Sequence, residues 1–172
     1  MKKTAILLSV LIIILTISCK KEYRFYGFDV KKTITLEIPA QTQEFDIESS
    51  VELYIEKLFE DKGTSADLVE EITIEDVIIE GKDYDIIDTI ALYISAEGLS
   101  KIPLADSHDA EIDNNIFDET YEAKLKVTDE KMDDYVKASS IKINSVGKLI
   151  FPAAQNETIE INLRFRVLTY VK

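Results

Sequence analysis

The segment ETIEINLRFRVLTY, residues 157–170, constrains the fold most, because its apolar and polar side chains alternate along much of its length. From residue 159 to residue 167, every second side chain is apolar and each one between is polar or charged. Successive side chains of a β-strand point to opposite faces, so this pattern predicts a long strand with one buried and one solvated face.

The same alternation recurs earlier in the chain. It predicts strands in TITLEI, TIALYISA and YEAKLKV, at residues 33–38, 89–96 and 121–127. In ITIEDVIIEG the apolar phase shifts by one residue near Glu75 and Asp76, which predicts a β-bulge. In SIKINSVGKLIF, residues 140–151, the segment 144–147 predicts a hairpin turn, and Pro152 would end the second arm or confine it to a sheet edge.

Short helices are expected between these strands. In SSVELYIEKLFEDKG, Ser49 and Glu52 have the spacing of a capping box, and Gly63 is a stop signal. TSADLVEEI and TDEKMDDYV each allow a further helical turn. Many strands with short helical connections and no βαβ rhythm predict a mainly β fold, an antiparallel β-sandwich with short helical insertions. We assign it to residues 33–172 as a single domain.

The N-terminus has the pattern of a signal peptide over residues 1–18. Lys2 and Lys3 precede an apolar run over residues 5–17, which is shorter than the ~20 residues of a spanning helix. Residues 16–19, Thr-Ile-Ser-Cys, resemble the lipobox of bacterial lipoproteins, although Leu15 stands one place earlier than in the usual motif. The resemblance implies a lipid-modified Cys19 as the first mature residue.

The same residues leave a second outcome open. Thr16 and Ser18 also satisfy the small-x-small rule of ordinary signal peptidase, which would release a soluble protein. If Cys19 is acylated, Lys20 stands where lipoproteins of the inner membrane typically carry Asp, so the resemblance implies the outer membrane, on either face. Residues 19–32 then form a lipidated lead and a possible first strand, containing the aromatic cluster EYRFYGFDV.

Charge and cysteine content exclude several classes of protein. The chain carries 20 basic and 33 acidic residues, and removal of Lys2 and Lys3 leaves 18 − 33 = −15. Such a surface repels phosphate backbones, so we expect no nucleic-acid partner. With one cysteine, no intramolecular disulfide can form, and stability must come from the apolar core.

An acidic stretch, ADSHDAEIDNNIFDETYE, is the one candidate for a metal site. Its alternating oxygen side chains are Asp109, Glu111, Asp113 and Asn115, as at the start of a calcium loop. Asn114 replaces the turn glycine of that motif, and Thr120 replaces its bidentate glutamate. We therefore expect a solvated acidic loop between two strands, and neither a metal nor a cofactor.

No convergent catalytic set is visible in the sequence. His108 is the only histidine, and its neighbours Ser107 and Asp109 are consecutive with it, whereas triads are assembled from separated positions. Acidic residues are plentiful, but a carboxyl that acts as a general acid must be desolvated to raise its pKa. We expect a non-enzymatic protein.

Three segments are similar to uncharacterised small envelope lipoproteins with an immunoglobulin-like or related β-sandwich body: DKGTSADLVEEITIEDVII, DIIDTIALYISAEGLSKIPLA and the final strand. The resemblance implies a fold and a location but no activity. We expect a membrane-anchored binding or scaffolding module whose partners are membrane lipid, through Cys19, and a protein or glycan. The alternatives are a carboxylate- or metal-dependent glycan hydrolase and an accessory subunit of an outer-membrane assembly.

Overall fold

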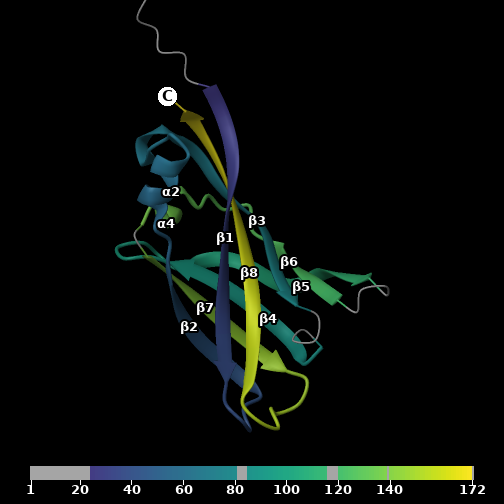
Figure 1. Cartoon of the computed structure of the whole chain (residues 1–172). Coiled ribbons are helices and arrows are strands. Elements are labelled where there is room, and N and C mark those ends of the chain that lie inside the picture. Colours follow the sequence, from purple (N-terminus) through teal and green to yellow (C-terminus); the bar gives the residue numbers. More distant parts are fainter. Residues whose placement is uncertain (1–23, 81–84, 116–119, 139, 172) are drawn as a thin grey trace, which may run out of the picture.

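The computed structural model describes residues 24–80, 85–115, 120–138 and 140–171, and most of them form β-strands (Figure 1). The strands are β1 (Arg24–Ile38), β2 (Glu44–Glu52), β3 (Val69–Glu80), β4 (Ile87–Ser95), β5 (Ile102–Asn115), β6 (Thr120–Val127), β7 (Ser140–Leu149) and β8 (Glu157–Val171). All eight belong to one sheet in the order β1-β8-β3-β6-β5-β4-β7-β2, and every pairing is antiparallel. The prediction of a mainly β, antiparallel fold with short helices is confirmed.

The sheet curls until its two edge strands, β1 and β2, contact each other. Lys32 of β1 lies at a position that faces inward, opposite buried Leu163, and its Nζ donates a hydrogen bond of 2.9 Å to the carbonyl oxygen of Glu52. The result is nearly closed and barrel-like. The two separate sheets of the predicted sandwich are not observed in the described residues. The sequence could not distinguish one curled sheet from two packed sheets, because alternation predicts which face of a strand is buried but not which strands cover that face.

A single core fills the inside of the curled sheet. The inward residues of β8 are at most 1% exposed, and they are Ile159, Ile161, Leu163, Phe165 and Val167. The predicted inward residues of the segments 33–38 and 89–96 are at most 3% exposed, and they are Ile34, Leu36, Ile38, Ile90, Leu92 and Ile94. Alternation therefore predicted the buried face of each of these strands correctly.

The bulge predicted in β3 is present. Ile74 pairs with Phe165 and Asp76 pairs with Arg164, so that Glu75 is the extra residue. After the bulge both Asp76 and Val77 are buried, which restores the apolar phase for the rest of the strand. The bulge also brings a carboxylate into a mostly covered position on the outer side of the sheet.

The predicted hairpin within residues 140–151 is wrong. Strand β7 runs without a turn from Ser140 to Leu149, because β2 and β4 pair with it along both sides. Gly147 is needed for packing and not for a turn, since a Cβ there would lie 2.5 Å from Cζ of Phe45 and 2.5 Å from the Thr89 carbonyl oxygen.

The helical segments are short. Helix α2 (Ile55–Asp61) follows β2 directly, so Ser49 and Glu52 lie in a strand, and the predicted capping box is wrong. Gly63 does end this segment, with a φ of 71°. The other two are a 3-10 helix, η1 (Ala66–Leu68), and α4 (Asp133–Val136). The turn predicted in TDEKMDDYV is present as α4, and Met132, Tyr135 and Val136 are buried there.

Strand β1 begins at Arg24, so the predicted boundary between residues 32 and 33 falls inside it. Arg24 pairs with Val171, and the first and last described residues lie together at the upper end of the molecule in Figure 1. The signal peptide predicted at 1–18 and Cys19 lie outside the described residues.

Candidate functional site

The acidic segment with Asp109, Glu111, Asp113 and Asn115 lies on strand β5, not on a loop. Glu111 pairs with Lys124 and Asn115 with Thr120, so hydrogen bonding to β6 keeps the segment extended. The expected loop is therefore corrected to a strand.

The side chains of Asp109, Asp113 and Asn115 lie outside the part that the structure describes. Among the side chains that it describes, no group of three or more His, Cys, Asp or Glu residues converges as metal ligands would.

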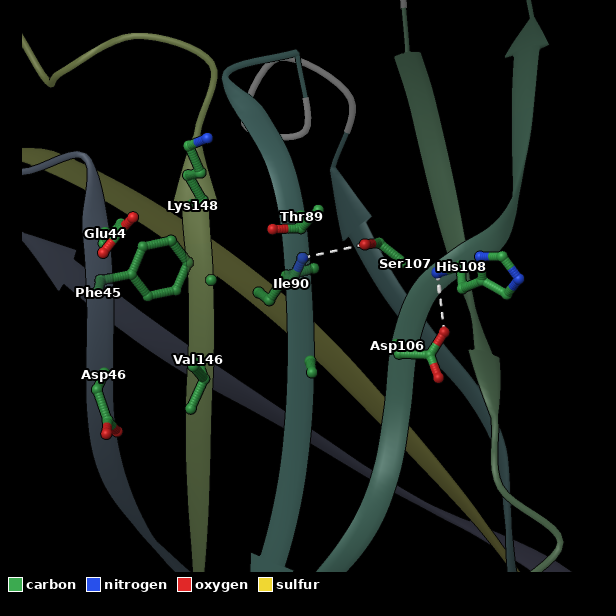
Figure 2. A pocket seen from close by; sticks show the side chains of 12 residues that line it. Glu44, Phe45, Asp46, Thr89, Ile90, Asp106, Ser107, His108, Val146 and Lys148 are labelled. Carbon is green, nitrogen blue, oxygen red and sulfur yellow. Dashed lines mark hydrogen bonds between the residues drawn. The ribbon is translucent and has the colours of Figure 1, made fainter.

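The residues around His108 make separate backbone contacts. Ser107 Oγ accepts a hydrogen bond of 3.0 Å from the Ile90 backbone nitrogen, and Asp106 Oδ1 accepts one of 2.8 Å from the backbone nitrogen of His108 (Figure 2). The imidazole of His108 points away from Phe45 and Val146 in the same view. The Ser107 contact joins strand β5 to β4, whereas the Asp106 contact lies within β5.

The most enclosed charged group is Asp76, which sits at the β3 bulge. Its side chain is 7% exposed and forms ion pairs with Lys124 of β6 and Arg164 of β8. Arg164 also approaches Asp29 of β1 at 3.7 Å and Glu75 at 3.6 Å. The cluster therefore links four neighbouring strands across the outer face of the sheet.

Burial acts to raise the pKa of the Asp76 carboxyl, but the hydrogen bond from Lys124 and the charge of Arg164 outweigh it, so that the pKa lies below its ordinary value. A general acid of a glycan hydrolase needs the opposite shift. Asp76 stays ionised at neutral pH and serves as an acceptor for the two cations.

A shallow depression of about 730 Å³ crosses the outer side of β2, β7, β4 and β5. Its residues are Glu44, Phe45, Asp46, Thr89, Ile90, Ala91, Asp106, Ser107, His108, Val146, Gly147 and Lys148 (Figure 2). Asp46 accepts a hydrogen bond of 2.5 Å from Asn144, and Lys148 lies 3.6 Å from Asp88. An open, acidic depression of this shape suits contact with another surface better than enclosure of a small molecule.

Beside this depression, the loop after β7 exposes three consecutive apolar residues, Ile150, Phe151 and Pro152, called here the apolar tip. Phe151 is 77% exposed and Ile150 is 45% exposed, and Pro152 is exposed as well. The loop lies at the lower end of the molecule in Figure 1, opposite the first described residues.

Backbone hydrogen bonds hold the apolar tip on both sides. The Ile150 nitrogen donates to the Ile86 carbonyl oxygen at 2.9 Å, and the Ala153 nitrogen donates to that of Thr42 at 2.9 Å. The Gln41 nitrogen in turn donates to the Ala153 carbonyl oxygen at 2.7 Å. A pre-organised aromatic residue loses little conformational entropy on binding, and aromatic residues are frequent anchors of protein interfaces.

The sequence analysis predicted neither the apolar tip nor the ion pairs of Asp76. It placed Phe151 on the second arm of a hairpin, although the adjacent pair Ile150 and Phe151 breaks the alternation that such an arm requires. Asp76 was recognised as part of a bulge, but its partners Lys124 and Arg164 come from distant strands, and alternation carries no information on which strands are neighbours.

Comparisons with protein-family models, with curated proteins and with solved structures find no match. Within the described ranges, each helix is too short and too polar to cross a bilayer. The fold defines the class of a mainly β protein whose described strands form one antiparallel, nearly closed sheet.

Proposed function

We propose that this chain is an outer-membrane lipoprotein that acts as a non-enzymatic binding or scaffolding module. In this proposal residues 1–18 are a signal peptide, Cys19 is acylated, and the body is related to the β-sandwiches of small envelope lipoproteins. Two facing halves of one curled sheet around a common core are compatible with that relation.

The apolar tip is the observation that carries the binding role. It presents Phe151 and Ile150 to solvent on a loop fixed by backbone hydrogen bonds, at the end opposite Arg24. Glu44 and Asp46 of the neighbouring depression give this end an acidic border. A protein with an apolar pocket and a basic rim fits these features, and this favours an accessory subunit of an envelope assembly.

Mass spectrometry of the N-terminus tests the anchor. The mature chain should lack residues 1–18 and should carry the added mass of acyl chains on Cys19. Stable anchoring requires two or more chains, because one gives only marginal membrane binding. An unmodified thiol at Cys19 in the mature protein would contradict the lipoprotein assignment.

Site-specific photocrosslinking in cells that naturally make the chain tests the binding role. A photoreactive phenylalanine analogue at position 151 should give one discrete adduct with another protein. The same analogue at Tyr54, which is 70% exposed but lies beside α2, serves as the matched control. The adduct should weaken in a Glu44→Lys, Asp46→Lys background. Equal adducts from both positions would count against a specific tip.

A further inference from the structure

Two exposed tyrosines lie at the end of the ribbon formed by β1 and β8, called here the terminal pole. Tyr26 is 45% exposed and Tyr170 is 37% exposed. Tyr26 pairs with Thr169, the neighbour of Tyr170, so the two tyrosines occupy adjacent registers on opposite faces of the ribbon. Strand β1 begins at this end of the molecule, and Cys19 precedes it in the sequence (Figure 1).

The terminal pole is joined firmly to the body of the protein. Thr64 Oγ1 lies 2.6 Å from Thr169 Oγ1 and donates to the Tyr170 carbonyl oxygen at 2.8 Å. On the same face as Thr169, the ring of Tyr26 stacks on Phe28 at 6.2 Å, and Phe28 meets Phe59 edge-on at 6.1 Å. The orientation of the pole therefore fixes the orientation of the whole sheet.

The chain between Cys19 and the sheet is short. Arg24 follows Cys19 by 24 − 19 = 5 residues, which span at most about 18 Å when fully extended. Tyr26 follows it by 26 − 19 = 7 residues, or at most about 25 Å. If Cys19 is held in a bilayer, the terminal pole cannot leave the neighbourhood of the headgroups.

The chemistry of the pole suits that position. Tyrosine is enriched at the boundary between lipid and water, where its ring contacts apolar atoms and its hydroxyl stays hydrated. Lys20 and Lys21 lie within the short tether and are attracted to anionic headgroups. The side of the sheet is less suitable, because Glu44, Asp46 and Asp106 border its depression and anionic lipid repels them.

We propose that the terminal pole rests on the bilayer surface, with Tyr26 and Tyr170 among the lipid headgroups, and that the curled sheet stands away from the membrane. This inference rests on the lipid anchor proposed above. Strand β1 has 15 residues, and at about 3.3 Å per residue it carries the apolar tip roughly 45 Å further from the surface. The tip is then presented to a partner that does not lie in the same bilayer.

Tryptophan fluorescence tests this orientation, because the chain has no tryptophan of its own. Chains that begin at Cys19 carry either Tyr26→Trp or, as the matched control, Phe151→Trp. Each is coupled through its single thiol to maleimide-bearing lipid in vesicles of phosphatidylcholine and phosphatidylglycerol. The Tyr26→Trp emission should shift to shorter wavelength and be quenched by brominated phosphatidylcholine, while the Phe151→Trp emission should change in neither respect.

Two results would overturn the proposal: no quenching of Tyr26→Trp although coupling is complete, or equal quenching of both variants, which means that the protein lies on its side. Circular dichroism checks that each variant is folded, and Tyr170→Trp replaces Tyr26→Trp if the latter is not. Because the lipid is attached chemically, this result does not depend on acylation in the cell. Mass spectrometry of the cellular protein can therefore reject the lipoprotein assignment without affecting the vesicle result.

Discussion

At the scale of single residues, Asp76 shows what alternation can and cannot predict. The shift of phase near Glu75 predicted the bulge, and the bulge is present. The ion pairs that the bulge creates were not predictable, because Lys124 and Arg164 lie on β6 and β8, far away in sequence. A carboxylate with 7% exposure is stable only because both of its oxygens have cationic partners.

The lowered pKa of Asp76 predicts a contribution to acid sensitivity. Its folded-state pKa lies below the unfolded value of about 3.9, so its contribution to stability is complete above about pH 4–5 and is lost as the pH falls through the folded-state pKa. Urea unfolding of the wild type and of Asp76→Asn should therefore give a stability difference that is constant from pH 7 to about 5 and shrinks below about pH 4. A difference that grows toward acid would contradict this sign.

At neutral pH, Asp76→Asn should lower the free energy of unfolding by about 1–3 kcal/mol, because Lys124 and Arg164 lose charged acceptors in a covered position. Glu75→Gln is the matched control, since its carboxylate lies 3.6 Å from the same arginine but its side chain is 37% exposed. That exchange should cost less than about 1 kcal/mol. Equal losses from the two variants would mean that burial of Asp76 is not important.

Gly147 gives a second prediction at the residue scale. Gly147→Ala should lower the free energy of unfolding by about 1–3 kcal/mol, because its Cβ meets the Phe45 ring and the Thr89 backbone and they cannot both move freely. Chemical unfolding measures the loss. Phe45→Leu removes the ring from this contact. In a Phe45→Leu background, Gly147→Ala should therefore lower the free energy of unfolding by less than it does in the wild type. It should still lower it, because the contact with the Thr89 carbonyl oxygen remains. Full recovery would show that the ring contact alone matters.

At the scale of secondary-structure elements, alternation predicted the amphipathic strands. It failed for segments whose conformation is set by pairing with neighbouring strands. The segments 33–38, 121–127 and 157–170 lie in strands, and so does 89–96 apart from Ala96, which follows β4. Asn144, Ser145 and Gly147 are residue types that favour turns. They nevertheless stay extended, because β2 and β4 form backbone hydrogen bonds with β7 on both sides. Residues 111–115 of β5 are likewise extended through pairing with β6, which no local pattern indicates.

The open edges of β1 and β2 give a prediction at this scale. Lys32 faces inward on an edge strand, and a charge in such a position discourages pairing with another chain. Lys32→Leu should therefore shift the purified protein toward larger species at equal concentration, as measured by sedimentation velocity. Lys31→Leu adds the same side chain on the outer face and should not have this effect; an equal shift would point to general surface hydrophobicity.

At the scale of the whole molecule, the order of the strands makes folding depend on β8. Among the described strands β8 comes last in sequence, yet it lies between β1, which comes first, and β3. Its ladder with β1 extends from Arg24 and Val171 to Ile38 and Glu157. Such non-local pairing is slow to form, so the sheet can be completed only when β8 joins β1 and β3.

Truncation after Asn156 should therefore abolish cooperative unfolding rather than merely lower its midpoint. The truncated chain loses the strand between β1 and β3 together with five inward side chains that are at most 1% exposed, and the remaining edges have no partner in place of β8. Circular dichroism during urea titration should show no sigmoidal transition. Removal of residues 1–23, which precede the sheet, is the matched control and should leave the transition intact. A cooperative transition in the chain that ends at Asn156 would mean that β1 can close the sheet without β8, and the dependence of folding on the last strand would have to be abandoned.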